Sequence, residues 1–120
     1  MASVQLKNLA GRHVAPTSKT FQAAAANADW AHAAGFYMVL TEQPGKESWP
    51  ITGASFILIY QDQPNASRAK TMLSFFNWCF RHGTATAEKL QYVPIPSKVM
   101  ELVETTWKTE IKSAGKPVWP

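Results

Sequence analysis

The feature that most constrains the fold is a nearly continuous apolar run, Phe56-Ile57-Leu58-Ile59-Tyr60, that closes a stretch beginning at Ile51. A turn signal, Gln43-Pro44-Gly45-Lys46, precedes this stretch, and the polar residues 61–65 end it. We therefore predict a strand over residues 51–60. A strand that is apolar on both faces lies inside a sheet that is covered on both sides, usually by helices. The run thus favours an α/β fold.

Three segments have the apolar periodicity of helices. The first begins at Thr17 or Ser18, either of which can cap it, and runs to about Trp30. The second covers residues 67–82 and the third residues 96–112. Their apolar faces are formed by Phe21, Ala24, Ala25 and Ala28 in the first, by Ala69, Met72, Leu73, Phe76, Cys79 and Phe80 in the second, and by Val99, Leu102, Val103, Trp107 and Ile111 in the third.

The remaining predicted elements are shorter. Alternation over Val4–Lys7 predicts a half-buried strand, and residues 8–12 read as a turn. The run Phe36–Leu40 is rich in aromatic and β-branched residues, which favours a strand. A short helical continuation is predicted over residues 84–90. Residues 113–120 form a tail that contains glycine and proline.

The two long helices, 67–82 and 96–112, are expected to pack against the 56–60 strand as one core. The reason is that three apolar stripes have no other partner of matching size. Trp78 and Trp107 lie beside apolar positions of these helices, and tryptophan is highly buried on average. We therefore expect both to pack in the interior. An aromatic cleft for sugars or stacked bases is the alternative interpretation.

Length and charge exclude several classes of protein. The 120 residues suffice for one domain with a sizeable core. The net charge is +4, but lysine and arginine are dispersed, so no nucleic-acid partner is expected. No apolar stretch is long enough to span a membrane. Residues 1–4 lack the pattern of an export signal, which leaves either a cytoplasmic protein or a mature or excised segment.

The sequence carries no recognisable catalytic or metal-binding motif. Cys79 and His82 can share a helical face, but no second Cys–His pair completes a metal site. Cys79 also falls within an apolar stripe, where a small buried side chain is the usual role. Neither His-Glu-x-x-His nor Gly-x-Ser-x-Gly occurs. We therefore expect no enzyme, no catalytic residue, no metal and no cofactor.

Two pairs of polar residues and two short motifs have structural explanations. They are the pairs Asp29 with His32 and Glu101 with Glu104, and the motifs Gly45-Lys46 and Asn65-Ala66-Ser67. The first pair is expected to cap or solvate a helix end, and the second to form a solvated helix face beside lysines. The glycine–lysine motif lacks the other residues of a phosphate loop and is expected to be a turn. The asparagine motif matches a glycosylation pattern, which a turn into a capped helix explains equally well.

A series of short, unusual sequence motifs nevertheless points to one family. The motifs are Asn27-Ala28-Asp29-Trp30, Ser48-Trp49-Pro50-Ile51-Thr52, Phe56-Ile57-Leu58-Ile59, Leu73-Ser74-Phe75-Phe76-Asn77-Trp78, Tyr92-Val93-Pro94-Ile95-Pro96, Trp107-Lys108-Thr109-Glu110-Ile111-Lys112 and Gly115-Lys116-Pro117. In this order and spacing the chain resembles the C-terminal part of the periplasmic phosphate-binding proteins of Pst-type phosphate ABC transporters.

The resemblance implies the C-terminal portion of a two-lobed periplasmic-binding-protein fold, in which each lobe is a mixed sheet flanked by helices. Residues 1–50 would belong to the second lobe. Residues 51–120, a strand with two long helices, would return to the first lobe. The implied location is the periplasm. The implied partners are inorganic phosphate, for the full-length protein, and the membrane subunits of the ABC transporter.

The same resemblance implies that this segment lacks the phosphate site. In the family the ligands come from earlier segments, and none of those motifs matches a position here, so no phosphate-binding residue is assigned. Weak anion binding at a helix N-terminus, near Ser67 or Ser97, is the most that these residues suggest. The alternative function is a truncated stand-alone module for protein interaction or self-association. It would be a homodimer with an exchanged element, because the 51–60 strand would lack its neighbours in the sheet.

Overall fold

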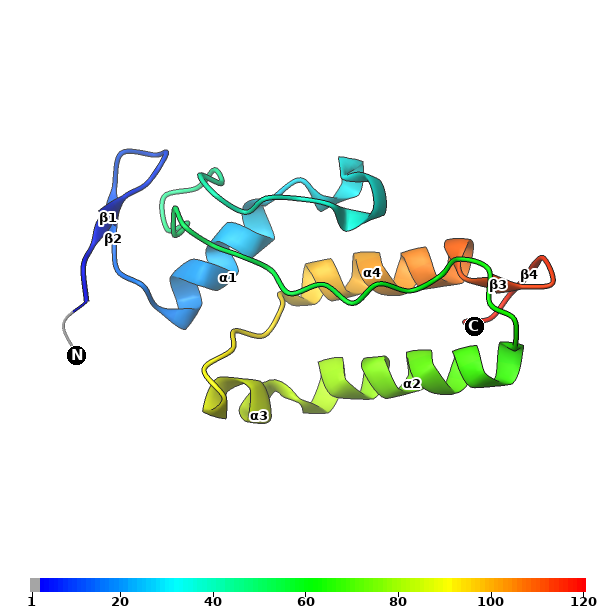
Figure 1. Ribbon diagram of the computed structural model, residues 1–120. Helices are drawn as coiled ribbons and strands as arrows, with labels where there is room; N and C mark the ends of the chain where they lie inside the picture. Colours follow the sequence, from blue (N-terminus) through cyan, green and yellow to red (C-terminus); the bar gives the residue numbers. More distant parts are fainter. Residues whose placement is uncertain (1–2) are drawn as a thin grey trace. The chain divides into compact units, whose positions relative to one another are not determined.

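The structure is a computed structural model that describes residues 3–120 (Figure 1). The chain divides into two compact units that are interleaved along the sequence. The first unit contains the described residues up to Ser55 together with Ile95–Val99. The second contains Phe56–Pro94 and Met100–Pro120. The described part is a mixed α/β structure with four α-helices and two small antiparallel sheets of two strands each.

The first unit begins with a short hairpin. Strand β1 (Leu6–Lys7) pairs with β2 (His13–Val14) in antiparallel register, with Leu6 opposite Val14. The intervening turn is closed by the Asn8 amide, which donates to the carbonyl of Arg12 at 2.8 Å. The structure thus confirms a short strand within residues 4–7 and the turn that follows it.

Helix α1 (Ser18–Asn27) follows the hairpin and begins where the sequence predicts. Thr17 is its N-cap: the Thr17 hydroxyl accepts from the Thr20 amide, and the Thr20 hydroxyl accepts from the Thr17 amide. This reciprocal arrangement satisfies backbone donors that a helix start leaves open. The helix ends at Asn27, three residues before the predicted end at Trp30.

The predicted strand at Phe36–Leu40 is wrong. Two short 3₁₀ turns, Trp30–His32 and Ala34–Phe36, occupy the start of this region, and residues 37–40 have no regular structure. Gly35 and Phe36 both have a φ of 59°. Two consecutive residues in the left-handed region reverse the chain, which prevents the extended backbone of a strand.

A turn at residues 41–51 completes the main part of the first unit, as the sequence predicts. Thr41 and Ile51 form an antiparallel bridge at its base, and the Glu42 amide donates to the Pro50 carbonyl. Inside the turn, the buried Ser48 hydroxyl donates to the carbonyl of Pro44 at 2.6 Å and lies 3.1 Å from Asn27 Nδ2. Hydrogen bonds of polar side chains therefore help to fix the shape of this turn, together with the buried Trp49.

Gly45 lies at the tip of this turn, and we expect Gly45→Ala to lower the free energy of unfolding by roughly 1–3 kcal/mol. The Gly45 φ is 111°, and an added Cβ would clash with the Asn27 side-chain amide and lie 2.9 Å from Ser48 Oγ. The control is Gly53→Ala, because φ at Gly53 is not positive and a Cβ there meets no atom within 4 Å. Equal losses for both variants in urea denaturation would contradict this account.

The second unit is built on two helices that lie side by side (Figure 1). They are α2 (Ala66–His82) and the greater part of α4 (Ser97–Glu110). The short helix α3 (Thr84–Lys89) follows α2. These bounds confirm the predicted helices to within two residues at each end. Between the two long helices and the C-terminal residues lies the core, formed by Ala69, Leu73, Trp107, Ile111 and Val118, with Ile59, Met72, Phe76, Phe80, Val103 and Trp119 packed against it.

The C-terminal residues, predicted as a tail, form a hairpin. Strand β3 (Lys112–Ser113) pairs with β4 (Lys116–Pro117). Ala114 and Gly115 between them have φ of 50° and 74°. Positive φ at both central residues is the mark of a type I′ turn, whose twist matches that of two antiparallel strands. The hairpin brings Val118 back, so that its amide donates to the carbonyl of Ile111.

The predicted strand over 51–60, and with it the mixed sheet flanked by helices, is not formed in the described residues. Apart from the bridge at Ile51, residues 52–60 have no strand assignment. A strand needs a neighbour of similar length, and the strands that the described chain offers are two residues long. The shared core of the two long helices is confirmed, but the 56–60 run joins it only through Ile59.

Candidate interaction surface

Cys79 and His82 lie near the C-terminal end of α2. Cys79 is half-buried, close to the expected buried role. His82 Nδ1 lies 3.1 Å from the carbonyl oxygen of Trp78, and the two rings stack with centroids 5.3 Å apart. Among the described residues no three metal-ligating side chains come together. No helix of that part of the chain combines the length and the hydropathy of a membrane span.

The two polar pairs, Asp29 with His32 and Glu101 with Glu104, differ in their exposure to solvent. His32 Nδ1 lies 2.7 Å from Asp29 Oδ1, and both side chains are exposed, in agreement with the solvated role predicted for them. Glu101 is exposed as well. Glu104 is not part of a solvated face beside lysines: its carboxylate is half-buried and accepts from Arg81 Nη2 at 2.7 Å. This ion pair joins α4 to α2.

The two short motifs have the structural roles predicted for them. Gly45 and Lys46 belong to the turn described above. Asn65 caps α2, because its side-chain oxygen accepts from the amide of Arg68 at 2.9 Å. Ser67 and Ser97, near the starts of α2 and α4, are exposed.

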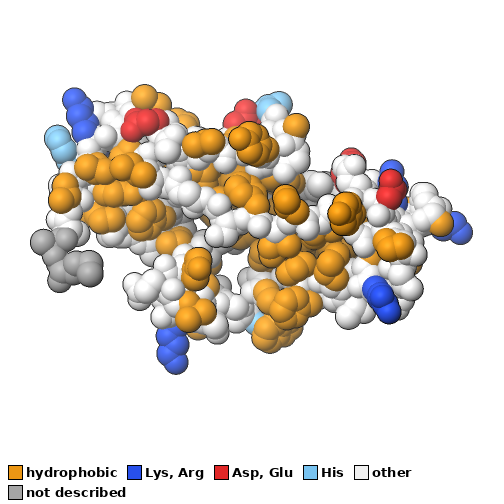
Figure 2. All heavy atoms as spheres, viewed as in Figure 1, with side chains coloured by type: hydrophobic (Ala, Val, Ile, Leu, Met, Phe, Trp, Pro, Cys, Tyr) orange, Lys and Arg blue, Asp and Glu red, His pale blue; other side chains and the backbone are white. Residues whose placement is uncertain are grey.

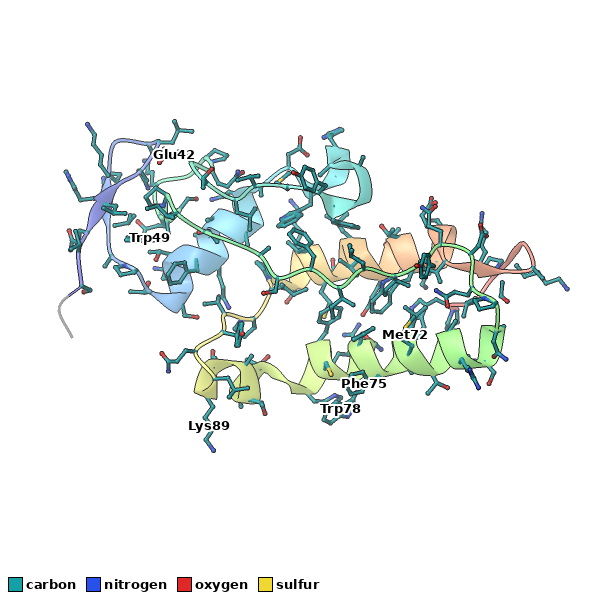
Figure 3. The ribbon with its side chains drawn as sticks, in the orientation of Figure 1. Glu42, Trp49, Met72, Phe75, Trp78 and Lys89 are labelled. Atoms are coloured by element: carbon teal, nitrogen blue, oxygen red, sulfur yellow. The ribbon has the colours of Figure 1, made fainter. Side chains whose placement is uncertain are left out.

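The second unit exposes apolar side chains at Leu90 and Tyr92, which follow α3, and in two further places. One is the run Phe56–Tyr60, here called the 56–60 segment, in which Leu58 is 95% and Tyr60 86% exposed. The other is the outer face of α2, formed by Phe75 and Trp78. Figure 3 shows both side chains on the side of α2 opposite to Met72, which points toward α4. In Figure 2, orange side chains reach the surface in this part of the molecule.

Trp78 corrects one prediction of core packing and Trp107 confirms the other. Trp107 is 6% exposed, whereas Trp78 is 57% exposed. The helical spacing explains the difference. Leu73 and Phe76 lie on the face that contacts α4, and Phe75 and Trp78, three residues apart, form a second apolar stripe on another face. The apolar face predicted for this helix contains neither Phe75 nor Trp78, and the expectation that Trp78 is buried rests only on its position beside apolar residues, although the spacing of Phe75 and Trp78 indicates a separate stripe.

The 56–60 segment is extended but unpaired. Figure 1 draws it as part of a long green trace without an arrow. Residues 53–59 make no backbone hydrogen bond within the described chain. At its C-terminal end the chain is anchored on β3. The Lys112 amide donates to the Gln61 carbonyl at 2.8 Å, and the Gln63 amide donates to the Lys112 carbonyl at 2.7 Å.

This arrangement suits contact with another stretch of polypeptide. The segment offers free main-chain donors and acceptors together with large apolar side chains, which are the requirements for adding a strand. The exposed surface of the second unit is therefore the candidate functional site.

Comparison with known proteins gives a consistent set of relatives. The chain is 42% identical over 120 residues to "Phosphate-binding protein PstS" of Pasteurella multocida (strain Pm70), which covers 99% of this chain. It is 44% identical over 112 residues to the protein of the same name from Haemophilus influenzae (strain ATCC 51907 / DSM 11121 / KW20 / Rd), and 41% identical over 112 residues to that of Xylella fastidiosa (strain Temecula1 / ATCC 700964). No protein-family model matches the sequence.

The matches cover only part of each relative. The chain spans 35%, 34% and 31% of these three proteins, or about one third of their length. Their names describe binding proteins and not enzymes, in agreement with the expectation of a non-enzymatic role. Over nearly its whole length, this chain is thus homologous to phosphate-binding proteins PstS and corresponds to about one third of such a protein.

Proposed function

We propose that this chain is the C-terminal portion of a phosphate-binding protein that serves phosphate import through an ABC transporter in the periplasm. The observation that carries the proposal is the identity of 42–44% to phosphate-binding proteins over at least 93% of the chain. The sequence motifs quoted in the sequence analysis resemble, in order and spacing, the C-terminal part of that family. The whole protein would bind inorganic phosphate and deliver it to the membrane subunits of the transporter.

Within that protein, residues 1–50 would belong to the second lobe and residues 51–120 to the first. The change of unit between Ser55 and Phe56 supports a lobe boundary in this region, five residues beyond the one predicted. The return of Ile95–Val99 to the first unit is an additional exchange that the resemblance does not include. The role of this portion would be structural: it would supply part of each lobe, and a surface for the transporter.

The portion would carry no phosphate ligands of its own. Its anion-attracting groups are dispersed lysines and arginines, whose fields are screened beyond about 8 Å at physiological salt. Tight phosphate binding uses several converging hydrogen-bond donors in a site that excludes water. We expect no such cluster at the starts of α2 and α4, where Ser67 and Ser97 are exposed.

The proposal predicts that the 120-residue chain alone binds phosphate no more tightly than millimolar and without preference over sulfate. Calorimetry at 0.15 M salt, with sulfate as the competitor, measures both properties. The positive control is a chimera in which these residues replace the matching third of the Haemophilus influenzae protein. This chimera is expected to bind phosphate selectively. Micromolar, sulfate-resistant binding by the chain alone would overturn the absence of ligands, and a folded chimera without phosphate binding would overturn the function.

A stand-alone self-association module is the second candidate, and the exposed 56–60 segment is the observation that favours it. A second copy could pair with this segment about a two-fold axis. Sedimentation equilibrium distinguishes the two candidates. A monomer at high concentration removes this one, whereas a dimer that Leu58→Asp dissociates would support it.

A further inference from the structure

We draw no further inference here: the strongest candidate, the exposed apolar stripe that Phe75 and Trp78 form on the outer face of α2, carries none because nothing in the structure shows what covers it.

Discussion

Replacing Asn8 by aspartate is expected to lower the free energy of unfolding by about 3–5 kcal/mol, the range for an uncompensated buried charge. Asn8 is buried, and its Nδ2 donates to three carbonyl oxygens, those of Gly45 at 3.2 Å, Lys46 at 3.0 Å and Ser48 at 3.1 Å. Aspartate has the same shape but no hydrogen to donate. A carboxylate oxygen would therefore face three carbonyl oxygens, and the turn at 41–51 would lose its attachment to the β1–β2 hairpin.

The matched control is Asn65→Asp, which makes the same chemical change where only an acceptor is needed. The Asn65 oxygen accepts from the Arg68 amide at the start of α2, and aspartate caps helices as well as asparagine does. The negative charge at a helix N-terminus is itself favourable. We expect this variant to unfold within about 0.5 kcal/mol of the parent. Urea denaturation at pH 7 measures both, and similar losses would refute the assigned role of Asn8.

The Asn8→Asp variant should also acquire a pH dependence. The folded protein favours the protonated form of the introduced carboxyl, because that form can donate to a carbonyl oxygen, so the carboxyl's pKa is raised above its unfolded value of about 4. With more protons bound in the folded state, stability rises as pH falls from the raised pKa toward about 4. Denaturation at pH 5 and pH 7 should therefore show a smaller deficit, relative to the parent, at pH 5.

Trp107→Ala is expected to destabilise the second unit by about 3–5 kcal/mol, the range for a buried tryptophan. The Trp107 ring stacks on Phe80 with centroids 5.9 Å apart and meets Trp119 edge-on at 5.5 Å. Its removal leaves a cavity between α2, α4 and the C-terminal residues. The remaining side chains can close this cavity only in part, because each is already packed against the core.

Trp78→Ala is the matched control, since it removes the same side chain from an exposed position. Its ring contacts His82 along the helix surface, so we expect a loss of less than about 1 kcal/mol. Thermal and urea denaturation, followed by circular dichroism, compare the two variants. Comparable losses would mean that the two tryptophans are equally buried, contrary to the structure.

Elements set by local chemistry could be predicted from the sequence. Thr17 caps α1 and Asn65 caps α2, and each cap is settled by residues within three positions of it. The short strand near Leu6 and the turn at Gly45 are likewise determined by residues close to them in the sequence. The end of α1 was misplaced because alanine favours a helix everywhere, while the chain leaves the helix at Ala28, which is extended.

Elements that depend on distant partners could not be predicted. The 51–60 run has the composition of a buried strand, but composition does not say whether a neighbouring strand is available. The helical, apolar segment around Trp78 predicts that this side chain is buried. The exposure of Trp78 depends instead on which face of α2 contacts α4. These two features form the candidate surface. The sequence indicates that their residues are apolar, but it does not indicate that they are exposed.

The interleaving of the two units sets the order in which their segments are synthesised. The chain leaves the ribosome N-terminus first, so the residues up to Ser55 emerge before Phe56–Pro94. The last part of the same unit, Ile95–Val99, follows only after Phe56–Pro94 has been made. At about 5–20 residues per second this interval lasts roughly 2–8 s. The N-terminal unit is thus completed only after α2 and α3 have been translated, and codons that slow translation of residues 56–94 would prolong its incomplete state.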